Sequence, residues 1–262
     1  MRQIGINMGS FPGIGQEDYA AKVKALGFDT VFSGVFGEWA GQCALADILA
    51  KNGLIYENLH APFGHINDIW LDREGGEKML EELMFSVGAC HAAGVPILVV
   101  HLSAGMKPPS ITDIGRGRFA TLVEHAVKND VILAFENQRK LANISWVFEE
   151  FDDCDNVRFC WDCGHEACFT LGREYMPLFG KKLVCTHIHD NTAEFNADLH
   201  LIPFDGKIDF SRFAEHIRNS GYTGPLTLEI MAKNREQYSN IDADVYLQRA
   251  ADAIKKLRSM VD

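Results

Sequence analysis

The amino-acid sequence predicts an α/β fold consisting of a single (β/α)8 TIM barrel over residues 1–262. Short apolar runs alternate with longer segments of helical periodicity, which is the pattern of parallel strands joined by crossover helices. Eight such runs in 262 residues fit one eight-stranded barrel. A doubly wound open sheet is the alternative, but the turn Met8–Gly13 after the first run lacks the G-x-G-x-x-G spacing of a dinucleotide site.

Each expected strand is a short run in which β-branched and other apolar residues predominate, as in parallel strands that are covered on both faces. A polar or charged residue closes each of these runs. The expected strands are Gln3–Asn7, Thr30–Ser33, Tyr56–His60, Ile97–His101, Val131–Glu136, Val157–Asp162, Leu183–His187 and Leu226–Glu229.

The segments between the strands carry apolar residues at helical spacing. The expected helices are Glu17–Leu26, Trp39–Lys51, Glu74–Ala93, Asp113–Lys128, Ile144–Phe151, a short piece near Glu166–Leu171, Phe210–Asn219 and Asp242–Met260. The stretch Asn191–Asp209 is the longest without clear periodicity, and such loops are more often functional than idle. No linker or low-complexity tract indicates a second domain.

The charge balance argues against several classes of partner. Thirty-six acidic and 25 basic residues leave a net charge of −11, which opposes sequence-independent binding to nucleic acids or to anionic membranes. No apolar run approaches the roughly 20 residues of a membrane-spanning helix, and the first residues lack the apolar core of a secretory signal. The seven cysteines are an odd, scattered set typical of reduced thiols, so we expect a cytoplasmic protein.

Ionisable side chains gather at the carboxyl ends of the expected strands, and barrel enzymes build their active sites at that face. A single histidine or carboxylate at such a position is usually an ordinary hydrogen-bonded residue. Seven at one face require a compensating cation, and mixed histidine and carboxylate ligands suit a divalent metal. The seven are His60, His101, Glu136, Asp162, His165, His187 and Glu229.

Taken in order, six segments resemble the xylose-isomerase-like superfamily, which includes the sugar phosphate isomerase/epimerase families and the endonuclease IV-type nucleases. The segments are Leu59–Pro62, Val99–His101, Ala134–Asn137, Trp161–His165, Thr186–Asn191 and Leu228–Glu229. The resemblance implies one divalent metal ion (Mn, Mg, Co or Zn) held by Glu136, Asp162, His187 and Glu229. It also implies that Glu136 and Glu229 act as catalytic acid and base.

The resemblance extends to the residues around this set. Members with an H-x-x-D motif place the metal ligand three residues before the acidic residue, here Asp190, which selects His187 rather than His189. His189 is then a supporting or substrate-facing residue, or an ordinary polar loop residue. The expected substrate-binding histidines are His60, His101, His165 and His200. In the nucleases, the residues that match these four and Asp198 help to hold two further metals.

Three features favour a small sugar or polyol substrate over DNA. The segment after His101 is Leu102–Gly105, whereas in the nucleases it is rich in Pro, Gly, Ser and His. The net charge is strongly negative, and the chain has little spare length for loops that read DNA. The first expectation is therefore a metal-dependent isomerase or epimerase of a sugar. The alternatives are a dehydratase of an inosose- or dehydroshikimate-like substrate, a multi-zinc phosphodiesterase, and a non-catalytic barrel that binds a sugar or serves as a partner subunit. Ala193 stands where ketohexose 3-epimerases place an arginine, which weakens that assignment and leaves the substrate open. Relatives are often dimers or tetramers, so the resemblance is compatible with a homo-oligomer.

Overall fold

The computed structural model describes residues 1–262 and contains eight β-strands in one parallel sheet. The strands are β1 (Ile4–Asn7), β2 (Thr30–Gly34), β3 (Ile55–His60), β4 (Ile97–His101), β5 (Ile132–Glu136), β6 (Val157–Asp162), β7 (Leu183–His187) and β8 (Leu226–Leu228). Their order in the sheet is β7-β6-β5-β4-β3-β2-β1-β8. A parallel bridge between Ile188 and Leu228 joins the two ends of that order. This topology is that of a (β/α)8 barrel, which confirms the expected fold class.

Helices fill the connections between successive strands, as parallel pairing requires. The α-helices are α1 (Gln16–Ala25), α2 (Trp39–Lys51), α3 (Glu74–Ala93), α4 (Asp113–Lys128), α5 (Leu141–Glu150), α6 (Cys163–Phe169), α7 (Met176–Phe179), α8 (Phe210–Ser220) and α9 (Ala243–Val261). Three short 3-10 helices are η1 (Ile66–Trp70), η2 (Gly180–Lys182) and η3 (Glu236–Tyr238). None of the helices has the length and apolar composition needed to span a bilayer.

The expected boundaries hold to within one residue for most elements, but helix α5 begins at Leu141 rather than at Ile144. Two further differences lie at α6 and β8. Helix α6 begins at Cys163 rather than near Glu166, because the side chain of Asp162 caps it by accepting a hydrogen bond from the backbone N–H of His165 at 2.6 Å. Strand β8 ends at Leu228, so Glu229 lies just beyond it. The short elements η1, α7, η2 and η3 were not expected, because single turns are too short to show periodicity.

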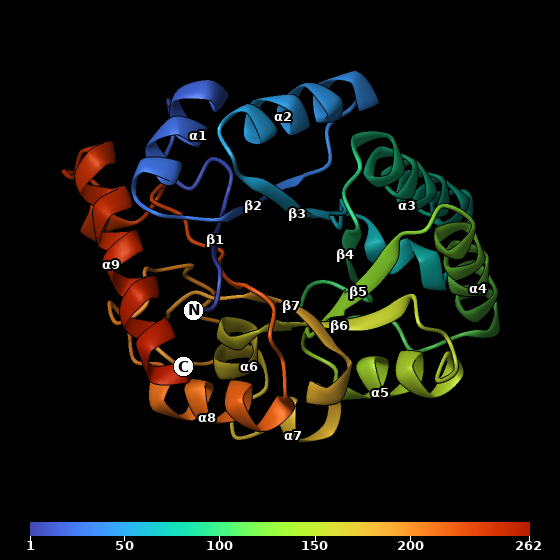
Figure 1. Cartoon of the computed structure of the whole chain (residues 1–262). Helices are drawn as coiled ribbons and strands as arrows, with labels where there is room; N and C mark the ends of the chain where they lie inside the picture. Colours follow the sequence, from blue (N-terminus) through green and yellow to red (C-terminus); the bar gives the residue numbers. More distant parts are fainter. The chain divides into compact units, whose positions relative to one another are not determined.

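The chain folds into two compact units. The first unit comprises Met1–Ser33, Leu45–Tyr56 and Trp161–Asp262. Within it, β1 pairs in parallel with β2 on one side and with β8 on the other. Helix α9 packs against α1 and α8, as Figure 1 shows. The first and last strands of the chain are therefore neighbours in this unit.

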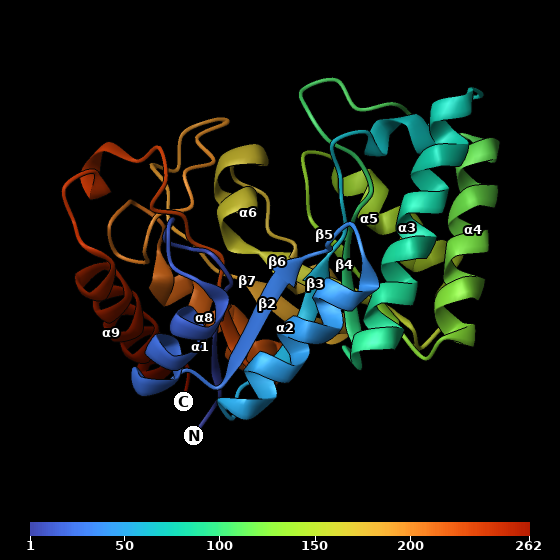
Figure 2. The same ribbon diagram turned by 90° about the horizontal axis from the view of Figure 1, so that it is seen from above.

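The second unit comprises Gly34–Ala44 and Glu57–Cys160. Its strands pair in parallel in the order β3, β4, β5 and the first part of β6, and the register sets His101 opposite Glu136. Helices α3 and α4 lie side by side over this unit (Figure 2). The ring of Phe119 in α4 packs against that of Trp70 in η1, with centroids 5.0 Å apart. That residues 1–262 form a single domain stays a prediction.

Candidate metal centre

Three of the expected metal ligands converge in the first unit. Asp162 is the last residue of β6, His187 is the last residue of β7, and Glu229 follows β8. One ligand atom of each lies within 4.8 Å of the others. The side chains of Asp162 and His187 are fully buried, whereas that of Glu229 is 19% exposed. Two carboxylates and an imidazole at this spacing are a donor set that suits a divalent cation.

The backbone and neighbouring rings orient these three side chains. Asp162 Oδ1 accepts the hydrogen bond that caps α6, which fixes the carboxylate at the end of its strand. The ring of His187 stacks on Phe32 of β2 with centroids 4.7 Å apart, and its Nδ1 lies 3.3 Å from Glu229 Oε2. The backbone N–H of Glu229 donates to the carbonyl of Ile188 at 2.9 Å, so Glu229 continues the pairing of β8 with the end of β7.

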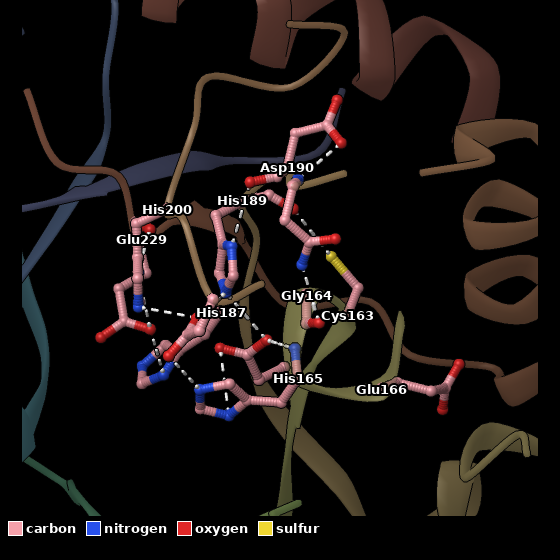
Figure 3. A network of polar contacts seen from close by, with 12 residues as sticks. Cys163, Gly164, His165, Glu166, His187, His189, Asp190, His200 and Glu229 are labelled. Atoms are coloured by element: carbon pink, nitrogen blue, oxygen red, sulfur yellow. Dashed lines mark hydrogen bonds and ion pairs between the residues drawn. The ribbon is translucent and has the colours of Figure 1, made fainter. Parts of the chain in front are cut away.

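A second group of potential ligands lies beside them in the same unit. Ligand atoms of His165, His189, Asp198 and His200 lie within 4.8 Å of one another. The rings of His189 and His200 stack with centroids 4.1 Å apart, and Asp198 Oδ1 lies 3.2 Å from His200 Nε2. Figure 3 shows the three histidines close to Glu229 and His187. We call these four residues the histidine cluster.

The histidine cluster is also electrostatically coupled. Burial favours the neutral acid of Asp198, but the imidazoles of His165 and His200 outweigh it and hold the pKa of the carboxyl well below its usual range. Burial lowers the pKa of His200, yet Asp198 and Glu229 together raise it to about 9. His189 Nε2 and Asp198 Oδ1 are buried, and their polar neighbours Asp162 and His200 lie at ion-pair distance, 3.2 Å, without hydrogen-bond geometry. A bound cation would supply the positive charge that the protonated imidazole otherwise brings.

The second unit contains its own group of ionisable residues at the ends of β3, β4 and β5. His60 Nε2 and His101 Nε2 lie 3.2 Å and 2.6 Å from the same oxygen of Glu136. His60 Nδ1 faces the carbonyl of Ala61 at 2.8 Å and must donate to it, which leaves Nε2 as an acceptor when the ring is neutral. Gln138 Nε2 lies 3.2 Å from His101 Nε2. The three residues His60, His101 and Glu136 also have ligand atoms within 4.8 Å of one another.

Comparison with known proteins identifies the family. A family model described as a xylose isomerase-like TIM barrel matches residues 20–257. The chain belongs to this family. Among curated proteins, the uncharacterized protein y4fM of Sinorhizobium fredii is 33% identical over 141 residues, which is 53% of this chain and 42% of that protein. The match therefore spans less than half the length of this relative.

Solved structures support the xylose isomerase-like fold over the whole chain. D-psicose 3-epimerase from Clostridium cellulolyticum, solved with D-tagatose, gives a TM-score of 0.79 at 14% identity and covers 100% of both chains. The E. coli 3-keto-D-glucoside 4-epimerase gives 0.74 at 18% identity and covers 99% of this chain and 100% of its own. A D-tagatose 3-epimerase-like protein gives 0.78 at 19% identity, with coverage of 100% and 98%. At these identities the likeness shows the fold alone.

Within this xylose isomerase-like chain, the expected site residues occur in both units. The structure brings Asp162, His187 and Glu229 together with His165 and His200 in the first unit, and it brings His60, His101 and Glu136 together in the second. The assignment of each residue as metal ligand, acid, base or substrate contact stays a prediction.

Sequence reasoning left the place of His189 open and missed two residues that support the site. His189 is fully buried, with Nε2 3.2 Å from Asp162 Oδ1, so it is not an ordinary polar loop residue. Gly164 makes room for it, since a Cβ there would meet the His189 ring at 2.0 Å. Asn7 of β1 bonds to both backbone groups of Ile230, next to Glu229, at 3.0 and 3.1 Å. A polar residue closing a strand was the one available signal for Asn7.

Proposed function

We propose that the protein is a divalent-metal-dependent isomerase or epimerase of a sugar or related polyol. The observation that carries this proposal is the convergence of Asp162, His187 and Glu229 at the ends of three neighbouring strands. Glu136 is proposed as the fourth ligand from the sequence pattern. The names of the structural neighbours, which include an L-ribulose 3-epimerase, support a sugar as substrate.

The chemistry follows from the residue types. When bound, a divalent cation acts as a Lewis acid that polarises substrate oxygens next to a carbonyl. Glu136 and Glu229 are proposed to move the proton on the neighbouring carbon, one carboxylate removing it and the other returning it. His200, which lies beside Glu229, and His165, which lies beside Asp162, are proposed to hydrogen-bond substrate oxygens. His60 and His101 are proposed to contact substrate as well, and His101 also to orient Glu136. The ion is proposed to be Mn, Mg, Co or Zn, and the imidazole in the donor set suits zinc better than magnesium.

Solvent isotope exchange tests the proposal directly. Ketoses and keto-glycosides are incubated in D₂O with the metal-replete protein, and deuterium on the carbon next to the carbonyl is measured by NMR. We expect exchange in at least one recovered sugar, and Glu229→Gln should slow it about 10²- to 10⁴-fold. Glu17→Gln, a matched change at an exposed residue of α1, should leave the rate unchanged.

Two outcomes would contradict the assignment. Near-normal deuterium exchange in both Glu136→Gln and Glu229→Gln would show that neither residue acts as the catalytic acid or base. Loss of a hydroxyl with formation of an absorbing enone would instead assign a dehydratase, which uses the same first proton transfer.

The histidine cluster favours a second candidate function, a multi-metal phosphodiesterase. Its four potential ligands lie beside Glu229, and His60, His101 and Glu136 form a further potential site in the second unit. The net charge of −11 opposes a nucleic acid substrate. About three zinc ions per chain together with cleavage of DNA at abasic sites would support this candidate, whereas one ion and no cleavage would exclude it.

A further inference from the structure

A buried carboxylate outside the proposed machinery organises the longest loop of the chain. Asp190 lies three residues beyond the end of β7, is fully buried, and accepts four backbone N–H groups. Its Oδ1 accepts from Asn191 at 2.8 Å and from Ile208 at 3.0 Å. Its Oδ2 accepts from Phe204 and Gly206, both at 2.9 Å. Hydrogen bonds to a charged acceptor are stronger than neutral ones, so one side chain ties together backbone positions up to 18 residues away.

The backbone of Asp190 holds the same loop from within. Its N–H donates to the carbonyl of Leu201 at 2.8 Å and its carbonyl accepts from the N–H of Leu201 at 2.9 Å, which makes an antiparallel bridge. The carbonyl of Asn191 accepts from Lys207 at 2.8 Å. The segment Asn191–Ile208, here called the Asp190 loop, is therefore closed on Asp190 at its start, middle and end.

The Asp190 loop has an unfavourable backbone conformation that the hydrogen bonds to Asp190 stabilise. Six non-glycine residues in the chain have positive φ, and four of them lie in this loop: Ala193, Asn196, His200 and Phe204. Residues with a side chain disfavour this region, and they persist in it only when surrounding contacts determine them. One of the four, His200 with φ 49°, belongs to the histidine cluster, and it directly precedes the bridge to Leu201.

Gly206 shows how closely the loop approaches its anchor. A Cβ at this position would lie 2.3 Å from the carbonyl oxygen of Asn191 and 2.4 Å from Asp190 Oδ1. Only a glycine lets the backbone come near enough for its N–H to reach the carboxylate. The carboxylate of Asp190 and the absence of a side chain at Gly206 are therefore both needed to hold the loop in this conformation.

We propose that Asp190 is a positioning residue whose carboxylate holds the Asp190 loop in the conformation that brings Asp198 and His200 to the candidate centre. Figure 3 shows Asp190 beyond His189, on the side of the cluster away from Glu229. Asp190 thus acts through the loop that carries Asp198 and His200. The structural part of this proposal is independent of the proposed function, whereas its effect on turnover rests on it.

Hydrogen exchange of the metal-free protein tests the structural part. In Asp190→Asn the side chain keeps one carbonyl oxygen, so two of the four N–H donors face an amide NH₂ group. We expect the amides of Phe204, Gly206 and Ile208 to exchange roughly tenfold faster or more, with strand amides unchanged. Asp209→Asn is the matched control, because Asn caps α8 as well as Asp does and the loop amides keep their protection. Unchanged protection in Asp190→Asn would overturn the proposal.

A double-mutant cycle tests whether Asp190 acts through His200. The effect of Asp190→Asn is measured in the wild-type chain and in His200→Ala, using kcat/KM on the sugar found by isotope exchange and Zn²⁺ affinity by calorimetry. Positioning predicts that the loss caused by Asp190→Asn shrinks in the His200→Ala background. Additive losses would show a merely structural role and overturn the proposal.

The two hypotheses fail separately. If no sugar exchanges deuterium, the proposed function is wrong. The role of Asp190 is still tested in that case, by Zn²⁺ affinity in the double-mutant cycle and by amide exchange in the Asp190 loop. If Asp190→Asn does not fold, Gly206→Ala replaces it in both experiments, because its Cβ pushes the loop off the same carboxylate. Normal amide exchange and normal Zn²⁺ affinity in Gly206→Ala would then overturn the proposal.

Discussion

At the scale of single residues, the geometry of the site depends on residues that take no part in the proposed reaction. The amide of Asn7 donates to the carbonyl of Ile230 and accepts from its N–H, at 3.1 and 3.0 Å. It thereby joins the end of β1 to the residue that follows Glu229. Gly164 has a similar indirect role, because its missing Cβ leaves room for the ring of His189. Both residues set where a charged group can lie.

Gly164→Ala should destabilise the protein and displace His189. The new Cβ would meet ring atoms of His189 at 2.0, 2.3 and 2.5 Å, and this ring is buried against His200. We expect a loss of about 1–3 kcal/mol in the free energy of unfolding, the usual cost of overpacking. Denaturant unfolding measures it, and Zn²⁺ affinity reports the displacement.

Gly117→Ala is the matched control for this prediction. Gly117 is an exposed residue of α4 with nothing within 4 Å of an added Cβ. Here the same substitution should raise stability by about 0.5–1 kcal/mol, because alanine favours a helix. Equal effects of the two variants would contradict the close packing of His189 on Gly164.

At the scale of elements, α8 is tied to the segment that precedes α7. Asp209 caps the start of α8, and Gly221 ends it with φ 76°. Arg212 of α8 bonds to both oxygens of Glu174, at 2.7 and 3.0 Å, and His216 lies 3.1 Å from the same carboxylate. The Arg212 guanidinium and then His216 lower the pKa of Glu174 to about 2. The charged carboxylate is therefore favoured in the folded state.

Removing this carboxylate should change the pH dependence of stability in acid. The folded pKa of Glu174 lies below its ordinary value of 4.5, so its contribution is present above pH 4.5 and is lost as pH falls towards 2. We expect Glu174→Gln to lower stability at pH 6 by less than about 1 kcal/mol, since the pair is exposed, and by less still at pH 3.

Urea midpoints of the wild type, Glu174→Gln and the exposed control Glu17→Gln, compared at pH 6 and pH 3, measure this effect. A wild-type advantage over Glu174→Gln that grows towards pH 3 would contradict the pairing with Arg212.

At the scale of the whole molecule, the two ends of the chain are held together in the first unit. Strand β1 pairs with β8, and the N–H of Arg2 donates to the carboxylate of Asp262 at 3.1 Å. The guanidinium of Arg2 also donates to the carbonyl of Tyr222 at 2.7 Å. Glu229 follows β8, so one of the proposed ligands depends on contacts between the first and last parts of the chain.

Metal binding should therefore stabilise the folded molecule as a whole. A ligand that binds only the native state at 100 times its dissociation constant adds about 2.7 kcal/mol. For a chain of this size we expect Mn²⁺ to raise the unfolding temperature of the EDTA-treated protein by roughly 5–10 °C.

Scanning calorimetry with and without Mn²⁺ checks this expectation. Asp162→Asn should lose most of the shift, and Asp209→Asn should keep it. An identical shift in both variants would place the ion elsewhere.

Much of the fold was predictable because the signals are local. The helices Trp39–Lys51, Glu74–Ala93 and Asp113–Lys128 have the expected boundaries, since each has a full-length apolar pattern. The start of α6 was not predictable from periodicity, because it depends on Asp162 acting as both strand end and helix cap. The candidate ligands were predictable as residue types at strand ends, since those ends meet in a parallel barrel.

By itself, the sequence determined the alternation of strands and helices and the residue types that close each strand, because periodicity and composition are properties of neighbouring residues. Only the tertiary structure decided that His189 is buried beside Asp162, that Gly164 makes room for it, and that Asp190 gathers the N–H groups of Phe204, Gly206 and Ile208. These contacts join residues far apart along the chain, and they exist only once the strands have paired and the loop has closed.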